Sequence, residues 1–283
     1  MYQALYRKYR PQTFDDVIGQ PAVSQTLKTQ IKSGHLSHAY LFTGSRGTGK
    51  TSCAKILAKA VNCEHPVNGD PCCQCPSCVG LENGSFLDVL ELDAASNNGV
   101  DQVRALRDEA IYAPANVKKR VYIVDEVHML STAAFNALLK ILEEPPAHLM
   151  FILATTELHK VPATILSRCQ RYSFKRILPK DIAQRLSYVA GQEHIDLTAD
   201  GAELLSRLAD GALRDGLSLL DQCAAAGGTV DSRAVLEVLG LAGNLQTAQL
   251  MRHILDRNAQ AALLLLNELY AGGKDVGAVL GEL

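Results

Sequence analysis

The sequence predicts an α/β domain built on a buried parallel sheet, followed by helical domains. In the first part of the chain, short apolar runs that suit buried parallel strands alternate with helical patterns. One of these runs leads through a glycine-rich loop into a helix. After Pro179 the strand-like runs stop, and short amphipathic helical patterns replace them.

The expected strands all lie between Ala39 and Phe174. They are Ala39–Phe42, Phe86–Leu92, Val121–Val124, Phe151–Ala154 and Tyr172–Phe174. Polar or acidic residues follow several of them. Because ligands of open α/β sheets bind at the carboxyl ends of the strands, we expect the chemistry at that edge.

The chain is expected to divide into residues 1–178, 179–242 and 243–283. The helices expected after Pro179 are Ile182–Gln192, Asp200–Ala209, Leu213–Ala226, Leu245–Asp256 and Ala259–Tyr270. The apolar periodicity continues to Leu283 without a helix stop signal, so we expect the sequence to end inside a domain.

Composition sets wide bounds on function. The chain has 283 residues, of which 47% are hydrophobic and 20% charged, which is ordinary for a globular protein with a sizeable core. The net charge of −2 argues neither for nor against a polyanionic partner. No apolar run is long enough to span a bilayer, and the N-terminus lacks the apolar stretch of a signal peptide. We therefore expect a cytoplasmic protein without a membrane partner.

The glycine-rich loop matches G-x-x-x-x-G-K-[ST] at every position. It consists of Gly44, Ser45, Arg46, Gly47, Thr48, Gly49, Lys50 and Thr51, and Ser52 follows it in the helical stretch Ser52–Ala60. Backbone N–H groups of such a loop converge on an anion, and the helix N-terminus adds partial positive charge. Lys50 would reach the β- and γ-phosphates, and Thr51 would hold Mg²⁺. The loop predicts binding of a nucleoside triphosphate.

A second acidic motif completes the expected nucleotide site. The apolar run Val121–Val124 ends in Asp125 and Glu126. Asp125 would hold Mg²⁺, directly or through water, and Glu126 would orient the attacking water. The run Phe151–Ala154 ends in Thr155 and Thr156, either of which would contact the water or the γ-phosphate, or simply cap a turn.

Several long motifs resemble one family. They are the N-terminal segment Tyr9–Gln20, the segments Asp125–Leu130 and Asn136–Pro146, and the triplet Ser167-Arg168-Cys169. Together they resemble the AAA+ clamp-loader ATPases, and within them the gamma/tau family of bacterial DNA polymerase III. The resemblance runs from about Tyr6 to about Leu241. It implies that residues 179–242 are a helical lid and that residues 243–283 begin a helical collar.

The resemblance also implies residue roles that spacing does not give. Thr155 is similar to the residue called sensor 1, and Arg168 to the arginine finger given to the neighbouring subunit's ATP. Arg214, within Gly211–Asp215, is similar to sensor 2, which contacts the γ-phosphate in cis. On the adenine side, the resemblance places four binding residues in the N-terminal segment: Arg10, Pro11, Val17 and Ile18.

Five of the eight cysteines crowd between Cys63 and Cys78. Four of them, Cys63, Cys72, Cys75 and Cys78, have spacing that suits tetrahedral zinc, and the resembled family carries a zinc module of this spacing at this place. Four protein ligands leave no open position, so a structural ion is expected. Cys73 would replace Cys72 or remain free, His65 is a weaker substitute for Cys63, and a reduced cluster without metal is the alternative.

DNA-contact candidates follow from the resemblance, because clamp loaders enclose primer-template DNA. Ser96, Asn97 and Asn98 lie where a strand leads into a helix, and Thr164 lies in the expected helix Thr164–Arg168. Free helix N–H groups there would bind phosphate, although Ser96 or Asn98 would serve equally well as a helix cap. Without a base-reading motif, we expect recognition of the DNA backbone.

The function implied by the resemblance is that of the ATP-driven motor of the replicative clamp loader. The implied partners are delta, delta-prime and further gamma/tau copies in a hetero-oligomer, the sliding clamp, and primer-template DNA. The polymerase activity of the DNA-directed DNA polymerase holoenzyme would belong to another subunit, and the location would be the nucleoid at replication forks.

Three alternatives stay open at this point. An archaeal or eukaryotic-type small subunit shares Ser-Arg-Cys, but the cysteine module argues against it. A non-hydrolysing scaffold such as delta-prime would have a degraded P-loop, whereas this one is intact. A zinc-centred interaction module with a vestigial ATP site would not bind nucleotide.

Overall fold

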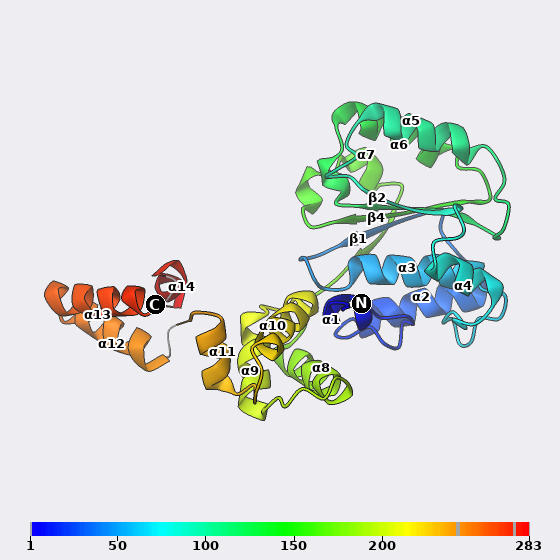
Figure 1. The fold of residues 1–283 in the computed structure, drawn as a ribbon. Helices are drawn as coiled ribbons and strands as arrows, with labels where there is room; N and C mark the ends of the chain where they lie inside the picture. The colour runs from blue at the N-terminus through cyan, green and yellow to red at the C-terminus, as the bar shows by residue number, and fades with distance from the viewer. Residues whose placement is uncertain (1, 242–243, 274–275, 283) are drawn as a thin grey trace. The chain divides into compact units, whose positions relative to one another are not determined.

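A five-stranded parallel sheet forms the centre of a unit that contains residues 7–178 and 211–214. The computed structural model describes residues 2–241, 244–273 and 276–282. Within this range the sheet has the order β2-β3-β4-β1-β5 (Figure 1). Its strands are β1 (Ala39–Thr43), β2 (Val89–Asp93), β3 (Arg120–Asp125), β4 (Leu149–Thr155) and β5 (Gln170–Ser173). The predicted α/β class with a parallel sheet is confirmed.

Two expected strands need correction at their ends. The run Phe86–Leu92 begins too early, because β2 starts at Val89. The ring of Phe86 packs instead against Gly80, where an added Cβ would lie 2.6 Å from it. At the other end of the sheet, β5 ends at Ser173, although Phe174 N still donates to Thr43 O at 2.7 Å.

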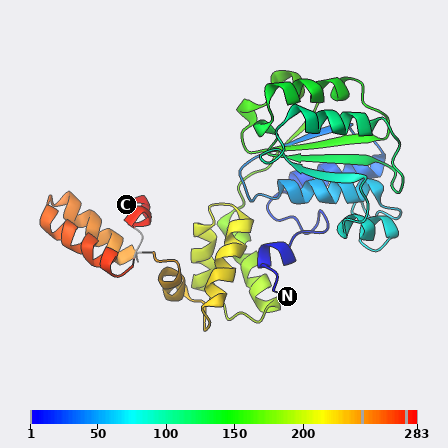
Figure 2. The same ribbon diagram turned by 45° about the horizontal axis from the view of Figure 1, so that its top comes forward.

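Helices cover both faces of the sheet (Figures 1 and 2). One face carries α2 (Pro21–Ser33), α3 (Lys50–Asn62) and α4 (Pro76–Glu82). The other carries α5 (Val100–Ala110), α6 (Thr132–Glu143) and α7 (Ala163–Leu166). The helix expected at Thr164–Arg168 instead begins at Ala163 and ends at Leu166, so Arg168 lies beyond its end.

Alternating side chains of each central strand enter two separate cores. Tyr40 and Phe42 of β1 pack with α2 and α3, whereas Ala39 and Leu41 pack with α5 and α6. All residues of β1 and β4 are buried. Burial on both faces explains why these strands read as continuous apolar runs.

The strand order brings three carboxyl ends together. β4 lies between β3 and β1, and Thr43 at the end of β1 is in register with Thr155 at the end of β4. Gly44 N, the first amide of the glycine-rich loop, donates to Thr155 O at 3.3 Å. The loop, Asp125 and Thr155 therefore share one edge of the sheet.

The remaining described residues form a helical unit. Its first helices are α8 (Pro179–Gln192), α9 (Ala199–Leu208), α10 (Leu213–Ala225) and α11 (Ser232–Val238), with Leu213 and Arg214 of α10 assigned to the sheet unit. Thr198 and Asp231 cap α9 and α11 by accepting from the amides of Gly201 and Ala234. The short helix α1 (Leu5–Lys8) begins in this unit, where Leu5 N donates to Asp221.

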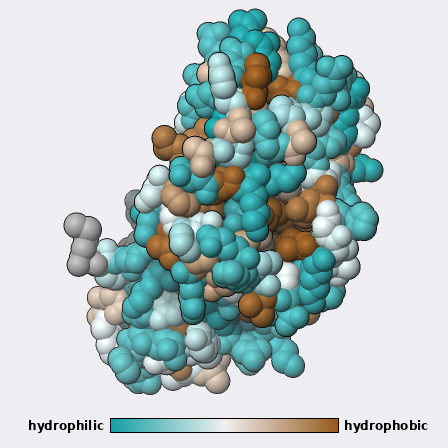
Figure 3. Space-filling model, turned by 90° about the vertical axis from the view of Figure 1, so that its right-hand side faces the viewer, coloured by the Kyte–Doolittle hydropathy of each residue, from teal (hydrophilic) through white to brown (hydrophobic). Residues whose placement is uncertain are grey.

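The C-terminal helices are α12 (Asn244–Leu255), α13 (Ala259–Ala271) and α14 (Val276–Glu282). Leu250, Leu269 and Val279 form their small core. The boundary expected near Gly243 and the terminal Leu283 lie outside the described residues. Among the residues that the structure describes, no helix has the length and apolarity to cross a membrane. The face drawn in Figure 3 is largely hydrophilic, with hydrophobic residues in separate patches.

Candidate functional site

The glycine-rich loop has a backbone that only glycine fits at key positions. Gly44 and Gly47 have φ values of 143° and 75°. A Cβ on Gly44 would lie 2.3 Å from Phe174 O, and one on Gly47 would lie 2.6 Å from the Ala212 Cβ. The loop thus lies between Phe174, which follows β5, and the segment Gly211–Arg214. This segment belongs to the same unit as the loop and contains Arg214, the residue expected as sensor 2.

Lys50 is the buried cation of the loop. Its side chain curls back so that Nζ donates to Gly44 O and Ser45 O, both at 2.8 Å. Burial lowers the pKa of its ammonium, although Glu126 and Asp125 oppose this shift. Thr48 Oγ1 donates to Ser45 O at 2.8 Å, whereas Arg46 is exposed. These bonds shape the loop around the lysine.

Thr51 and Asp125, the two residues that the sequence predicts as magnesium ligands, are hydrogen-bonded to each other. Thr51 Oγ1, in the first turn of α3, donates to Asp125 Oδ2 at the end of β3 at 2.6 Å. A hydroxyl and a carboxylate are the oxygen ligands that Mg²⁺ prefers beside phosphate groups. The pair fits that ion.

Glu126 follows β3 in a left-handed conformation with φ 48° and ψ 46°. Its Oε2 accepts from Thr156 Oγ1 at 2.9 Å and from Thr156 N at 3.2 Å. Thr155, fully buried at the end of β4, places Oγ1 3.0 Å from His128 Nδ1 and accepts from Glu157 N. Thr155 therefore caps a turn and also faces His128, a residue that the sequence analysis did not single out.

The N-terminal segment reaches the loop and the helix behind it. Arg10 Nε donates to Ser52 Oγ at 3.3 Å, and a Cβ on Gly49 would lie 3.8 Å from Val17. Pro11, Val17 and Ile18 are half-buried. Arg10 and Val17 thus lie beside the start of α3 and the glycine-rich loop, and their place on the adenine side stays a prediction.

Arg168 makes contacts away from the loop. Its guanidinium pairs with Glu143 Oε1 of α6 at 2.7 Å and donates to Thr164 O at 2.8 Å. A third of its side chain is exposed. Sequence reasoning did not foresee the partner Glu143.

Three of the DNA-contact candidates, Ser96, Asn97 and Asn98, lie in the loop between β2 and α5. Ser96 Oγ donates to Asp93 Oδ2, and Asn97 Nδ2 donates to Asp93 O. The N-cap of α5 is Gly99, which has no side-chain cap, so neither Ser96 nor Asn98 caps this helix. Asn98 O accepts from Ser131 N, and Thr164 lies in α7.

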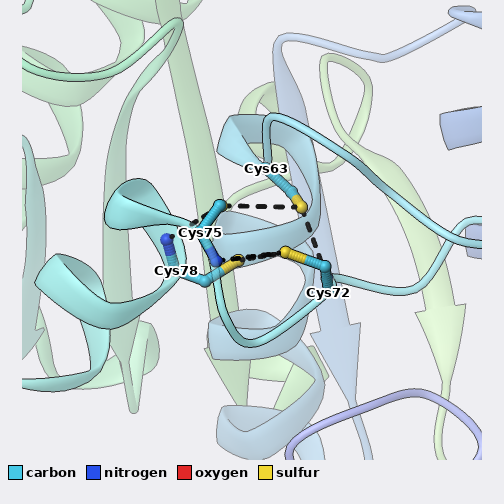
Figure 4. Close-up of side chains that lie close together, drawn as sticks. All are labelled: Cys63, Cys72, Cys75 and Cys78. Carbon is cyan, nitrogen blue, oxygen red and sulfur yellow. Dashed lines mark hydrogen bonds between the residues drawn. The ribbon is translucent and has the colours of Figure 1, made fainter.

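Four cysteines converge in the loop between α3 and β2 (Figure 4). The Sγ atoms of Cys63, Cys72, Cys75 and Cys78 all lie within 4.8 Å of one another, and the pairs Cys63–Cys75 and Cys72–Cys78 are 4.0 Å apart. Four thiolates around one zinc ion at 2.3 Å would be about 3.8 Å apart. The residues fit the ion.

Backbone amides support this cluster electrostatically. Cys72 N donates to Cys63 Sγ and Cys75 N to Cys72 Sγ, each at 3.3 Å. The N–H groups of Gln74 and Cys75 lower the pKa of the Cys72 thiol to about 6, whereas burial raises that of Cys63 and Cys78. Cys73, at φ 57°, instead directs its thiol at Gln12 O and Pro71 O, so it stays outside the four-cysteine cluster. His65 does not belong to the cluster either.

The cysteine module is fastened to the N-terminal segment by buried charges. Asp70 accepts from Phe14 N at 2.6 Å and pairs with Lys28 Nζ of α2 at 2.6 Å, and the side chains of Lys28 and Asp70 are each only 10% exposed. Lys59 of α3 pairs with Glu82 of α4 at 2.6 Å and contacts Gln12. No local sequence signal predicts these pairs.

Two family models match the chain. One, described as DNA polymerase III, delta subunit, matches residues 19–178. The other, described as DNA polymerase III clamp loader subunit, ATPase lid domain, matches residues 181–229. Together they cover most of the sheet domain and the helices α8, α9 and α10 that follow it.

Curated relatives match the whole chain. It is 50% identical to DNA polymerase III subunit tau of Bacillus subtilis, and the match covers all of this chain and 50% of that protein. It is 46% identical to subunit tau of Escherichia coli, and the match covers all of this chain and 44% of that protein. It is 39% identical to subunit gamma of Buchnera aphidicola, covering 78% of that protein. The chain spans about half the length of the tau relatives.

Among solved structures, the Thermotoga maritima RuvB Holliday junction branch migration motor shares the fold. The TM-score is 0.61 over 94% of this chain and 86% of that one, at 18% identity. This likeness concerns architecture alone: an α/β AAA+ domain with a helical lid. The family models and the curated relatives favour the bacterial assignment over the archaeal or eukaryotic alternative, and they show that the chain belongs to the gamma/tau family of DNA polymerase III clamp-loader subunits.

Proposed function

We propose that the chain binds ATP with Mg²⁺ at the glycine-rich loop and hydrolyses it as a motor subunit of the clamp loader. The observation that carries the proposal is the 2.6 Å bond between Thr51 and Asp125 beside the buried Lys50. It joins the two halves of an NTPase site that lie far apart in the sequence.

Each residue has a distinct task in this proposal. Lys50 turns from Gly44 O and Ser45 O to the β- and γ-phosphates, and the amides of Gly47 and Gly49 bind phosphate oxygens. Thr51 and Asp125 hold Mg²⁺, which when bound neutralises charge on the phosphates. Arg10, Pro11, Val17 and Ile18 line the adenine side.

Hydrolysis needs an oriented water molecule. Glu126 orients it and draws its proton, while Thr155 donates to the γ-phosphate or the water from the neighbouring strand. Arg214 contacts the γ-phosphate from the same chain. Arg168 acts on the nucleotide site of the neighbouring subunit. To do so, its guanidinium must leave the ion pair with Glu143 and contact the nucleotide of that subunit.

Membership of the family supports a proposal about the assembly and its location. We propose that the chain works with delta, delta-prime and further gamma/tau copies to open the sliding clamp and load it on primer-template DNA in the cytoplasm. Ser96, Asn97, Asn98 and Thr164 contact the DNA backbone in this assembly. Zinc bound by the four cysteines is structural. Residues 1–178, 179–242 and 243–283 are the ATPase, lid and collar parts.

Two substitutions test the catalytic site. Lys50→Ala removes the cation of the phosphate cradle and should abolish binding of a fluorescent ATP analogue. Glu126→Gln should retain binding while turnover in the assembled loader falls about a hundredfold or more, since it removes the group that orients the water.

The controls decide between this proposal and the alternatives. If the parent chain binds ATP but does not hydrolyse it even in the assembled loader, the chain is a non-hydrolysing scaffold. If it binds no nucleotide, the zinc-centred module with a vestigial site holds. Parental turnover by Glu126→Gln would show that the carboxylate is wrongly assigned.

A further inference from the structure

His128 lies between the two strands that carry the hydrolytic residues. It belongs to the 3-10 turn η1 (Val127–Met129) that follows β3, and its side chain is only 6% exposed. Its Nδ1 is 3.0 Å from Thr155 Oγ1 and 3.3 Å from Glu126 Oε2. On the other side of the ring, Nε2 is 3.3 Å from Glu157 Oε1. One imidazole therefore touches both groups expected to act on the water and the γ-phosphate.

The available donors and acceptors restrict how these groups bond. We place a hydrogen on Nδ1, because this nitrogen faces the carboxylate oxygen Glu126 Oε2 as well as Thr155 Oγ1, and a carboxylate oxygen serves as an acceptor. Thr155 Oγ1 also accepts from Glu157 N at 3.0 Å. With both lone pairs of Thr155 engaged, its own hydrogen is left to donate to a third group. That is the orientation a hydroxyl needs to detect a phosphate oxygen.

The same contact limits the freedom of Glu126. Its Oε2 already accepts from Thr156 N and Thr156 Oγ1, and His128 Nδ1 approaches it from η1. With Oε2 engaged in this way, Oε1 is the oxygen left to face a water molecule. A small displacement of such a group costs a large part of the rate.

We propose that His128 is a positioning residue for hydrolysis, which orients the Thr155 hydroxyl as a donor and fixes the Glu126 carboxylate. The inference rests on the proposed function, because the roles of Thr155 and Glu126 are assigned there. In this proposal His128 acts through Thr155 at the end of β4 and through the Glu126 carboxylate, both of which it contacts.

The test compares two replacements in the assembled loader. His128→Leu fills the space but removes the donor, and kcat should fall at least about tenfold while the Kd of the ATP analogue stays within about threefold. His128→Asn keeps an N–H near the position of Nδ1 and should restore most of the loss. His159→Leu, an exposed histidine beside the same Glu157, is the matched control and should leave both values unchanged.

A double-mutant cycle separates positioning from folding. Thr155→Val should lower kcat in the parent but cost little more in His128→Leu, because the hydroxyl is already misdirected there. Parental kcat in His128→Leu, additive losses, or failure of His128→Asn to restore kcat while retaining the parental Tm would overturn the inference. Glu126→Gln is measured alongside: if it too turns over normally, the proposed function fails, and if it is inactive while His128→Leu is normal, only this inference fails.

Discussion

Two buried lysines of α3 differ in their partners and therefore in their use. Lys50 bonds to the carbonyl oxygens of Gly44 and Ser45, so its charge remains available to an anion. Lys59, equally buried, is neutralised by Glu82 and contacts Gln12. Its pair fastens the cysteine module to α3. Burial alone does not identify a functional lysine. The two lysines differ because the partners of Lys50 are neutral carbonyl oxygens, whereas the partner of Lys59 is a carboxylate.

The Lys59–Glu82 pair should make stability depend on pH. Burial opposes ionisation of Glu82, but the Lys59 ammonium outweighs it and holds the pKa of that carboxyl below its ordinary value. The unfolded chain therefore takes up the proton first. The pair's contribution is present above pH about 4.5 and is lost as pH falls below it.

Lys59→Met should remove this part of the pH dependence, about 1 kcal/mol at most because half of Glu82 is exposed. Urea unfolding at several pH values checks it. Lys55→Met, which breaks the pair between Glu91 and a lysine more exposed than Lys59, is the control and should change the profile less. Equal pH profiles for the parent and Lys59→Met would contradict the assignment.

The cysteine module is a loop and one short helix with little apolar core of its own. Its buried centre consists of the cysteines themselves, Cys63, Cys75 and Cys78, with Cys72 packed against them. A segment of this size needs a metal or another staple to hold one shape. Ion pairs to α2 and α3 then fix the shaped module on the domain.

Replacing Cys75 and Cys78 together with serine should release about one zinc per chain, because two of four ligands are lost. Cys73→Ser should keep the metal, since its thiol faces Gln12 O and Pro71 O. Elemental analysis of the purified chains measures both. A parent chain free of zinc would end the proposal.

The whole assembly is expected to control hydrolysis, because the residue proposed as the finger is engaged within its own chain. Arg168 pairs with Glu143 and is partly exposed. The isolated chain should therefore bind ATP but turn it over slowly. Partners, clamp and DNA should raise the rate strongly.

Arg168→Ala should remove most of that gain, on the order of a thousandfold where a finger contributes fully, with little change in ATP affinity. Loaders that combine parental and Arg168→Ala subunits test this more sharply, because ATP hydrolysis should be lost at the site of the subunit next to the mutated one. Arg171→Ala, an exposed arginine of β5, is the control. A defect confined to the mutated subunit would show that Arg168 acts in cis.

Motifs read along the chain predicted much of the sheet and the candidate ligands, because a P-loop, an acidic strand end and paired cysteines are local patterns. Thr51 and Asp125 meet as expected. The Lys28–Asp70 pair and the contact of His128 with Thr155 were not predictable, since they depend on strand order and on how the module folds back. The start of β2 was misplaced because Phe86 is apolar yet packs on Gly80.

The strand order also bears on how the protein is made. β1 precedes the glycine-rich loop near the start of the chain, yet both of its neighbours, β4 and β5, are translated much later. During synthesis, a strand whose residues are all buried in the folded domain must wait for most of that domain to leave the ribosome before it can be paired. Such distant pairings also slow folding. The loop that is written early in the sequence thus acquires its shape only when Phe174, whose backbone packs against Gly44, has emerged.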